Sequence, residues 1–310
     1  MLLIATIVLF LLGLSGPRIL PEPLILSAFT LPLFVLNETY IAKDPVIPVT
    51  VMRSRGTLLT CLATVGSMMA RWGVLFYTPV FALAVRNWAP AAAGSILVPT
   101  NAGFATGGIL AGVIHIKREG SFYVHSIVAM ALWPVTMALI ALISTPTSSM
   151  ALYMCLVFLN GLITGAALNY TLVHLLHLTL PEVHPIIISL LATFRGFAGS
   201  FGSAIGGGLF TRVLYRSLVD GFSHEGLKHR EDLIRRLLGS PALVGKLEGT
   251  EKAVAVGAYQ DAIQALFYAA TGLAVIVTLV QALTGWKKPV PKTELPDETI
   301  AGEEGVIGGT

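Results

Sequence analysis

The sequence predicts an all-α, polytopic membrane protein, a helical bundle of about eight transmembrane helices. Three observations predict this fold class. First, 55% of the 310 residues are hydrophobic and only 12% are charged, about half the charged fraction of an ordinary soluble domain. Second, apolar runs of about 20 residues, the length that a membrane-spanning helix needs, recur along the chain. Third, these runs lack the apolar–polar alternation of a membrane β-barrel, and a helix satisfies its own backbone hydrogen bonds in lipid.

Eight apolar runs are candidate spans. They lie at about residues 2–14, 23–40, 58–85, 91–116, 124–143, 149–174, 186–215 and 261–285. The first run is short, but it lacks the basic n-region and the small-residue cleavage site of a signal peptide. We therefore interpret it as a span.

The basic residues of the short loops predict the orientation of the bundle. With eight spans, the loops alternate between two sides of the membrane. One side receives only Arg18 and Arg86 from its short loops, whereas the other receives Lys43, Arg53, Arg55, Lys117, Arg118, Lys287, Lys288 and Lys292. Because cytoplasmic loops carry an excess of Lys and Arg, the second side is predicted to be cytoplasmic, together with both termini.

Two polar segments interrupt or follow the spans. Residues 216–259 form a long loop on the extracytoplasmic side, and the tail 286–310, rich in Pro, Glu and Gly, is expected to be disordered. Within the loop, apolar residues recur at helical spacing, and Gly239 can end a helix. This pattern predicts a short amphipathic helix lying against the bundle or the membrane surface, with an ordinary surface loop as the alternative. Its apolar residues are Leu227, Leu233, Ile234, Leu237 and Leu238.

Glycines spaced by four residues recur inside the spans. The pairs are Gly103 with Gly107, Gly108 with Gly112, Gly161 with Gly165, and Gly202 with Gly206. A spacing of four puts both glycines of a pair on one helix face, where a neighbouring helix can approach closely. Gly199, Gly202 and Gly206 nearly share such a face and are predicted to pack against another helix. A dinucleotide-binding interpretation is rejected, because no strand precedes these glycines.

Two arginines, Arg71 and Arg195, lie inside apolar runs. A charge near the bilayer centre costs roughly 2.5–3.5 kcal/mol on the insertion scale. Such a side chain should therefore face a cavity or a partner, as a contact for substrate binding, proton coupling or gating. The alternative is an arginine near a span end whose side chain reaches the membrane interface.

Three asparagines, Asn101, Asn160 and Asn169, also fall within the spans. Hydrogen bonding between helices is the usual role of such neutral polar residues in membranes. A place in a solute cavity is the second role, because transporter cavities recruit these groups.

No residue pattern points to catalysis. The two cysteines, Cys61 and Cys155, lie in apolar runs without metal-ligand spacing. No acid pair, serine triad or phosphate loop occurs in a suitable context. We expect no enzymatic activity, metal or cofactor, and the net charge of +3 gives no sign of a nucleic-acid partner.

Three motifs resemble those of a known family. Residues 44–48, Asp-Pro-Val-Ile-Pro, followed by Arg53 and Arg55, resemble the central cytoplasmic link of fourteen-span transporters. Gly108 to Gly112, then Lys117, Arg118 and Gly120, resemble the C-terminal copy of the cytoplasmic-loop motif. Residues 194–202 resemble the penultimate span. The set resembles a fungal drug:proton antiporter of the major facilitator superfamily, and within it the vacuolar basic amino-acid transporters.

The resemblance implies a domain organisation. In this family, a twelve-helix core forms two halves with two extra spans between them. Residues 1–40 would be those two linker spans, 41–56 the cytoplasmic link, and 57–285 the C-terminal six-helix bundle, followed by the tail. The N-terminal six helices, with the main loop motif and the antiporter motif, have no counterpart among the eight spans.

The resemblance also implies a function. It implies proton-coupled secondary transport of a small solute, such as a drug or a basic amino acid, across the vacuolar or plasma membrane. The implied partners are the lipid bilayer, the solute, protons and a missing N-terminal half. The alternative is a non-transporting fragment, or a partner-binding membrane protein that lacks the N-terminal half.

The predicted orientation can be tested with single cysteines at Ser121 and Ser240. An impermeant thiol reagent should label the first from the cytoplasmic side and the second from the opposite side, because the charge bias places these positions on opposite faces. Labelling of both positions from one side would contradict the eight-span arrangement.

Overall fold

The computed structural model describes residues 2–16, 18–42, 54–115, 122–227 and 230–286, and every regular element in these ranges is helical. The predicted all-α class is thereby confirmed. Most of the predicted cytoplasmic link lies outside the described residues. The same holds for Lys117, Arg118 and Gly120 of the loop motif, and for the tail from residue 287.

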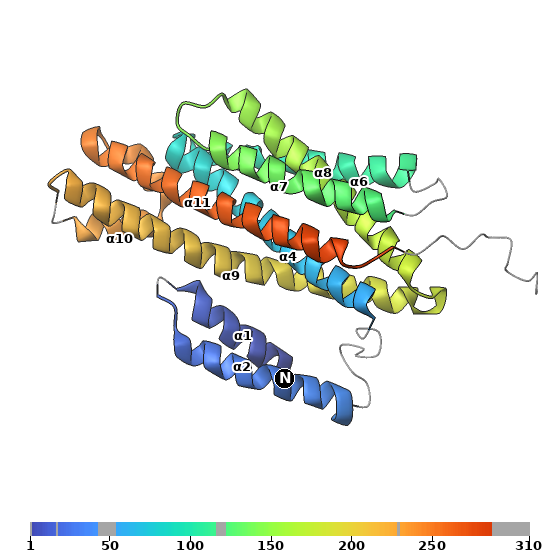
Figure 1. Ribbon diagram of the computed structural model, residues 1–310. Coiled ribbons are helices and arrows are strands. Elements are labelled where there is room, and N and C mark those ends of the chain that lie inside the picture. The colour runs from blue at the N-terminus through green and yellow to red at the C-terminus, as the bar shows by residue number, and fades with distance from the viewer. Residues whose placement is uncertain (1, 17, 43–53, 116–121, 228–229, 287–310) are drawn as a thin grey trace, which may run out of the picture.

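The long helices follow the apolar runs in order (Figure 1). They are α1 Leu2–Ser15, α2 Pro21–Leu36, α4 Arg55–Val80, α6 Leu97–Leu110, α7 Tyr123–Ile143, α8 Met150–Leu178, α9 His184–His224 and α11 Gly249–Ala282. The short α5 spans Pro90–Ala93, and α10 spans Glu231–Gly239. π-Helical turns prolong α2, α4 and α6 at Asn37–Ile41, Phe81–Val85 and Ala111–His115. Short 3-10 turns occur at Gly94–Ile96, Pro181–Val183 and Pro241–Lys246.

Seven of the described helical segments are long and apolar enough to cross a membrane. The eighth predicted span, α1, has only 14 residues and is about 21 Å long at 1.5 Å per residue, shorter than the roughly 30 Å hydrocarbon core. Large apolar side chains cover the outside of the bundle, and Phe29 (68%) and Leu279 (61%) are mostly exposed. Lipid is the solvent that such a surface requires, so the chain is a multi-pass integral membrane protein.

The bundle is built around α4 and α11 (Figure 1). α4 packs against α9 and α11, and α11 also contacts α7 and α9. α8 packs against both α7 and α6, which places the α6–α8 pair at one side. The α1–α2 hairpin lies beside α9 and reaches it through α1.

Arg212 and one pair of aromatic rings contribute to the attachment of the α1–α2 hairpin to α9. The Arg212 guanidinium donates to the carbonyl oxygens of Leu14, at 3.3 Å, and of Gly16, at 3.2 Å. A cation is favourable here, because the unpaired carbonyls at a helix C-terminus carry partial negative charge. The rings of Phe10 and Phe201 pack edge to face, with centroids 5.8 Å apart. These contacts fix the position of the hairpin on α9.

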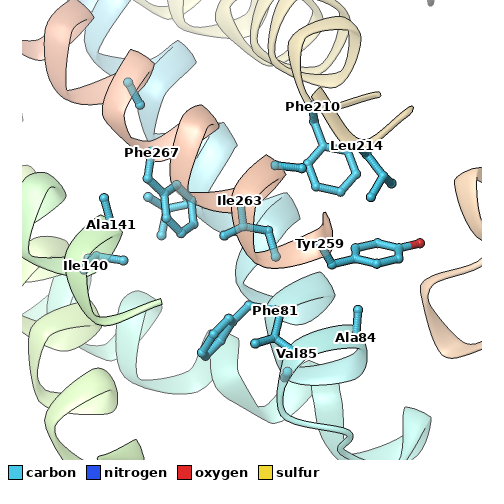
Figure 2. Packing of buried hydrophobic residues seen from close by; sticks show 14 of the residues in the cluster. Phe81, Ala84, Val85, Ile140, Ala141, Phe210, Leu214, Tyr259, Ile263 and Phe267 are labelled. Atoms are coloured by element: carbon cyan, nitrogen blue, oxygen red, sulfur yellow. The ribbon is translucent and has the colours of Figure 1, made fainter. Parts of the chain in front are cut away.

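A core of large apolar side chains fills the space between α4, α7, α9 and α11 (Figure 2). Phe81 and Val85 follow α4, and Ile140 lies on α7. They share this cluster with Phe267 and Tyr259 of α11. Because the cluster lies near the end of the bundle that carries α10, that end is tightly packed.

The segment between the last two spans is shorter than the sequence predicts. α9 continues to His224 and α11 begins at Gly249, so the connection covers 225–248 rather than 216–259. The reason is packing: beyond the apolar runs, buried side chains such as Phe222 and Ala255 continue the α9–α11 contact. Such contacts stabilise helical turns whose composition alone is polar.

The predicted amphipathic helix is confirmed as α10, which ends at Gly239 as expected. It lies against the bundle, where Ile234 and Leu237 are buried. The Tyr259 hydroxyl of α11 donates to the Leu237 carbonyl oxygen. These contacts hold the connection over the packed end of the bundle.

Two of the glycine pairs form one close contact between α6 and α8. A Cβ atom added to Gly161 would lie against the Thr100 carbonyl oxygen and 3.0 Å from the Phe104 amide nitrogen. In return, Cβ atoms on Gly103 and Gly107 would meet backbone atoms of Phe158 and Leu162 on α8. Gly165 meets the Phe104 carbonyl oxygen in the same way. The two backbones therefore touch where any larger residue would separate them. Gly112 makes no such contact, since nothing lies within 4 Å of an added Cβ.

The contact predicts opposite effects for two glycine-to-alanine changes. Gly161→Ala should destabilise the protein by about 1–3 kcal/mol, because the added methyl group forces α6 and α8 apart. Gly272→Ala in α11, where nothing lies within 4 Å, should be neutral or stabilising by up to about 1 kcal/mol from helix propensity. The midpoint of SDS-induced unfolding measures both changes. Equal midpoints for the two variants would contradict the backbone contact.

Candidate functional site

Arg71 lies in the interior of the bundle. It occupies α4 well inside the span, and its side chain is only 7% exposed. Its Nη2 atom donates to Asn101 Oδ1 at 3.2 Å, and its guanidinium carbon lies 3.9 Å from the centre of the Phe104 ring. Asn101 and Phe104 are three residues apart on α6, so one helix face supplies both contacts. A hydrogen bond and a cation–π contact therefore hold the guanidinium in one orientation.

One donor group of Arg71 remains unused. The Nη1 atom is buried, and it has no hydrogen-bond partner among the described residues. A buried charged donor without a partner is costly, because it has lost its water and gained nothing in return.

Arg195 and Arg71 line the same cavity. Arg195 lies on α9, is exposed, and forms no hydrogen bond or ion pair with any described residue. The cavity has a volume of about 520 Å³ and is open on one side. Its walls come from α4, α6 and α9, through Met68, Arg71, Trp72, Leu75, Phe104, Ala192, Arg195 and Gly196. The structure thus brings together two arginines that are far apart in the sequence.

Glycines of α9 position the two arginines. A Cβ atom on Gly199 would lie 3.2 Å from Trp72 Nε1, and one on Gly202 would lie 2.9 Å from the Met69 carbonyl oxygen. These two glycines therefore let α4 approach α9 closely just beside the cavity. Gly206 faces α11 instead, with Leu266 Cδ1 at 3.4 Å from an added Cβ. The predicted glycine face is thus shared between two neighbouring helices.

The three asparagines have different surroundings. Asn101 orients Arg71, as described above. Asn160 is buried and donates from Nδ2 to Thr136 Oγ1 at 2.9 Å, which joins α8 to α7. Asn169 donates to the carbonyl oxygen of Gly165 at 3.0 Å and faces Gly108 on α6. Asn160 and Asn169 do not line the cavity.

Sequence reasoning missed most of the cavity wall, notably Trp72, Phe104 and Gly196. Two weak signals could have found the aromatic residues. Trp72 directly follows Arg71, and Phe104 lies one turn after Asn101 on the same helix face. Arg195, which the sequence predicts to face a cavity or a partner, lines this open space.

The cavity carries one sign of charge. Its ionisable side chains are Arg71 and Arg195, and among the described residues no aspartate, glutamate or histidine lines it. Within the same part of the chain, no group of three or more His, Cys, Asp or Glu side chains could hold a metal ion. The arrangement can orient a solute by charge and apolar contact.

No protein-family model matches the chain. The chain is similar to MFS transporter L2 of Phoma sp., with 24% identity over 265 residues, which is 83% of this chain and 43% of that protein. It is also similar to Citrate exporter 1 of Yarrowia lipolytica, with 25% identity over 206 residues, covering 66% of this chain and 29% of the exporter. The chain thus spans less than half the length of either relative.

A solved structure shares the fold. It is a bacterial homologue of the human lysosomal transporter Spinster in an inward-facing and unoccupied conformation. The match has a TM-score of 0.55 at 13% identity and covers 86% of this chain and 58% of that one. The helical arrangement is therefore one found in part of that transporter structure.

The cavity predicts a difference between two adjacent residues of α9. In a variant without Cys61 and Cys155, Ala192→Cys should react with a small water-soluble thiol reagent, because Ala192 lines the cavity. Thr193→Cys should react at least about ten-fold more slowly, because successive side chains on a helix point about 100° apart and Thr193 does not line the cavity. Labelling in native membranes, read by mass spectrometry, compares the rates. Equal labelling rates at the two positions would contradict a water-filled cavity on the Ala192 face of α9.

Proposed function

We propose that this chain is the C-terminal six-helix bundle, with two preceding helices, of a major facilitator transporter. The transporter moves a small solute by alternating access. One observation carries the proposal: Arg71 and Arg195 face a single open cavity in an otherwise lipid-exposed helical bundle. A buried charge in a membrane-spanning helix is a candidate functional residue by default, because placing a charge in the bilayer costs free energy. Similarity to MFS transporter L2 supports the same function.

The open side of the cavity is the surface that a second bundle would cover. In transporters of this kind, the solute binds near the bilayer midplane between two halves that rock against each other. The partners are accordingly the solute, the lipid bilayer and an N-terminal half. The glycine contacts of α9 beside the cavity support rocking, because helices with few interlocking side chains can shift against each other.

The size and charge of the cavity fit some solutes better than others. A drug-like molecule suits a cavity of about 520 Å³ with four large apolar wall residues. A basic amino acid suits it less well, because its cationic side chain would face two arginines. The name of one relative, a citrate exporter, points to an anion in that protein.

Proton coupling is also proposed, on the resemblance to drug:proton antiporters. No aspartate, glutamate or histidine among the described residues lines the cavity, so the proton carrier would be supplied from elsewhere in the transporter. Collapse of an imposed pH gradient with an ionophore should then stop accumulation of the solute in vesicles.

The proposed orientation has both termini in the cytoplasm, with the connection 225–248 on the other side of a vacuolar or plasma membrane. The second candidate function is that of a non-transporting membrane protein that binds a partner through the open face. The open cavity between α4, α6 and α9 is the surface that such a partner would cover.

Transport is tested by exchanging Arg195. Arg195→Lys should lower solute uptake several-fold, because a point charge cannot reproduce the planar fork of donors. Arg195→Leu should lower it by about ten-fold or more, the loss expected for a charged hydrogen bond. The matched control is Arg216→Leu, an exposed arginine on the same helix outside the cavity.

Uptake is measured in vesicles prepared from membranes that contain the complete transporter and is normalised to inserted protein. Arg216→Leu should transport at the unmodified rate. If both Arg195 variants also transport normally, Arg195 has no part in the solute path. Absence of any solute-dependent uptake by the unmodified protein would favour the non-transporting function.

A further inference from the structure

We propose that the cavity between α4, α6 and α9 binds a soluble organic anion, a carboxylate with an apolar body, whose carboxylate group lies between Arg71 and Arg195. The proposal rests on the proposed function in one respect, since it takes this cavity to be the solute site. It adds the chemical class of the solute, and it is argued from charge, donor geometry and wall composition.

The charge of the cavity selects the sign of the ligand. Its two ionisable side chains are both cations, and neither forms an ion pair with a described residue. Two like charges that face one cavity repel each other, and both attract an anion, more strongly the less water the cavity holds. An anion between them relieves the repulsion, whereas a cation increases it.

Arg71 is prepared as a fixed anchor. Asn101 holds Nη2, the Phe104 ring lies against the guanidinium plane, and Nη1 has no partner among the described residues. The side chain is more than nine-tenths buried, so the unused donor is a buried cationic N–H group. A carboxylate oxygen is the acceptor that such a group binds most strongly.

Arg195 is the second cationic contact. It is exposed to the cavity and has no partner in the described part of the chain. The next residue, Gly196, also lines the cavity, and an added Cβ there would meet nothing within 4 Å. The space beside Gly196 is therefore open, and a solute bound by Arg71 can lie next to the Arg195 side chain.

The walls determine the rest of the ligand. Met68, Trp72, Leu75 and Phe104 supply apolar surface. The volume of about 520 Å³ lies within the range of roughly 300–1,000 Å³ found for sites of small organic ligands. An inorganic anion would leave most of this apolar surface uncovered. An aromatic or branched aliphatic carboxylate matches both the charge and the walls.

The test uses three probes of nearly equal size and shape, 2-naphthoate, 2-naphthamide and 2-naphthamidine, which are anionic, neutral and cationic. Each is titrated against the full-length chain in nanodiscs of neutral phosphatidylcholine. We expect 2-naphthoate to bind at least about ten-fold more tightly than the amide, because only the carboxylate adds the attraction of opposite charges to the hydrogen bonds. The amidine should bind most weakly, because its positive charge is repelled by both arginines.

Variants assign the effect to the arginines. Arg195→Gln should weaken 2-naphthoate binding by about ten-fold and leave 2-naphthamide binding unchanged, because it removes a charged donor and keeps the apolar walls. Arg216→Gln is the matched control and should change neither. Arg71→Gln should resemble Arg195→Gln. The Arg71 change also removes contacts to Asn101 and Phe104, so this variant can fail to fold. In that case the Arg195 variant alone shows whether the arginines bind 2-naphthoate, because Arg195 is exposed.

Several outcomes overturn the inference. They are equal affinity for the three probes, tightest binding of the amidine, binding of none of them, or unchanged 2-naphthoate binding in Arg195→Gln. Nanodiscs that contain phosphatidylglycerol test the other source of an anion. If this lipid abolishes 2-naphthoate binding to the unmodified chain, the occupant is a lipid phosphate and not a soluble carboxylate. Undiminished binding supports the soluble solute.

The inference and the proposed function can fail separately. Binding of the probes is measured without transport, and vesicle uptake is measured without the charge series. If the protein transports only neutral or cationic solutes, the proposed function is supported and the anion site is contradicted. If 2-naphthoate binding depends on Arg195 but the protein transports no solute, the anion site is supported and the transport function is contradicted.

Discussion

The backbone contact between α6 and α8 is the constraint on which the cavity depends. Phe104 belongs to both the contact and the cavity. Its backbone lies against Gly161 and Gly165, and its ring lies against the Arg71 guanidinium. Asn101, one turn earlier, orients the same arginine. In lipid, apolar side chains give little driving force for helix association, so close backbone packing must position such groups. The glycines of α8 therefore determine, through α6, where a charge on α4 can lie.

The fold was largely predictable because lipid leaves few alternatives. A run of about 20 apolar residues can satisfy its backbone only as a helix, so each predicted span matches one observed helix. The ends of α9 and α11 were not predictable from apolarity, since beyond the spans they are stabilised by contacts with each other. α10 was predictable because its apolar residues keep the helical period within a polar segment.

The site was predictable only in part. A single residue in the sequence can indicate that a charge in lipid is costly, but it does not indicate which other residues lie near it. Arg71 and Arg195 attract attention by the cost of a charge in lipid, yet nothing in the sequence indicates that they share a cavity. Asn160 has the same local signal as Asn101, and only the arrangement of helices gives it Thr136 as its partner. Trp72 and Phe104 look like ordinary apolar span residues, and their role depends on what lies opposite them. The glycine pairs likewise show that a contact exists without identifying the partner helix.

Because α9 is long, a small tilt of this helix at the cavity moves its far end by a large distance. The helix has 41 residues and is about 61 Å long, roughly twice the thickness of the hydrocarbon core. His224, at its far end, is 29 residues beyond Arg195, a distance of about 44 Å. A tilt of roughly 10° about the cavity would displace that end by about 8 Å if the helix stays straight and its packed neighbours α10 and α11 move with it. Since Arg212 ties the α1–α2 hairpin to the same helix, the hairpin would swing with it, and a small change around the solute becomes a large movement at the membrane surface.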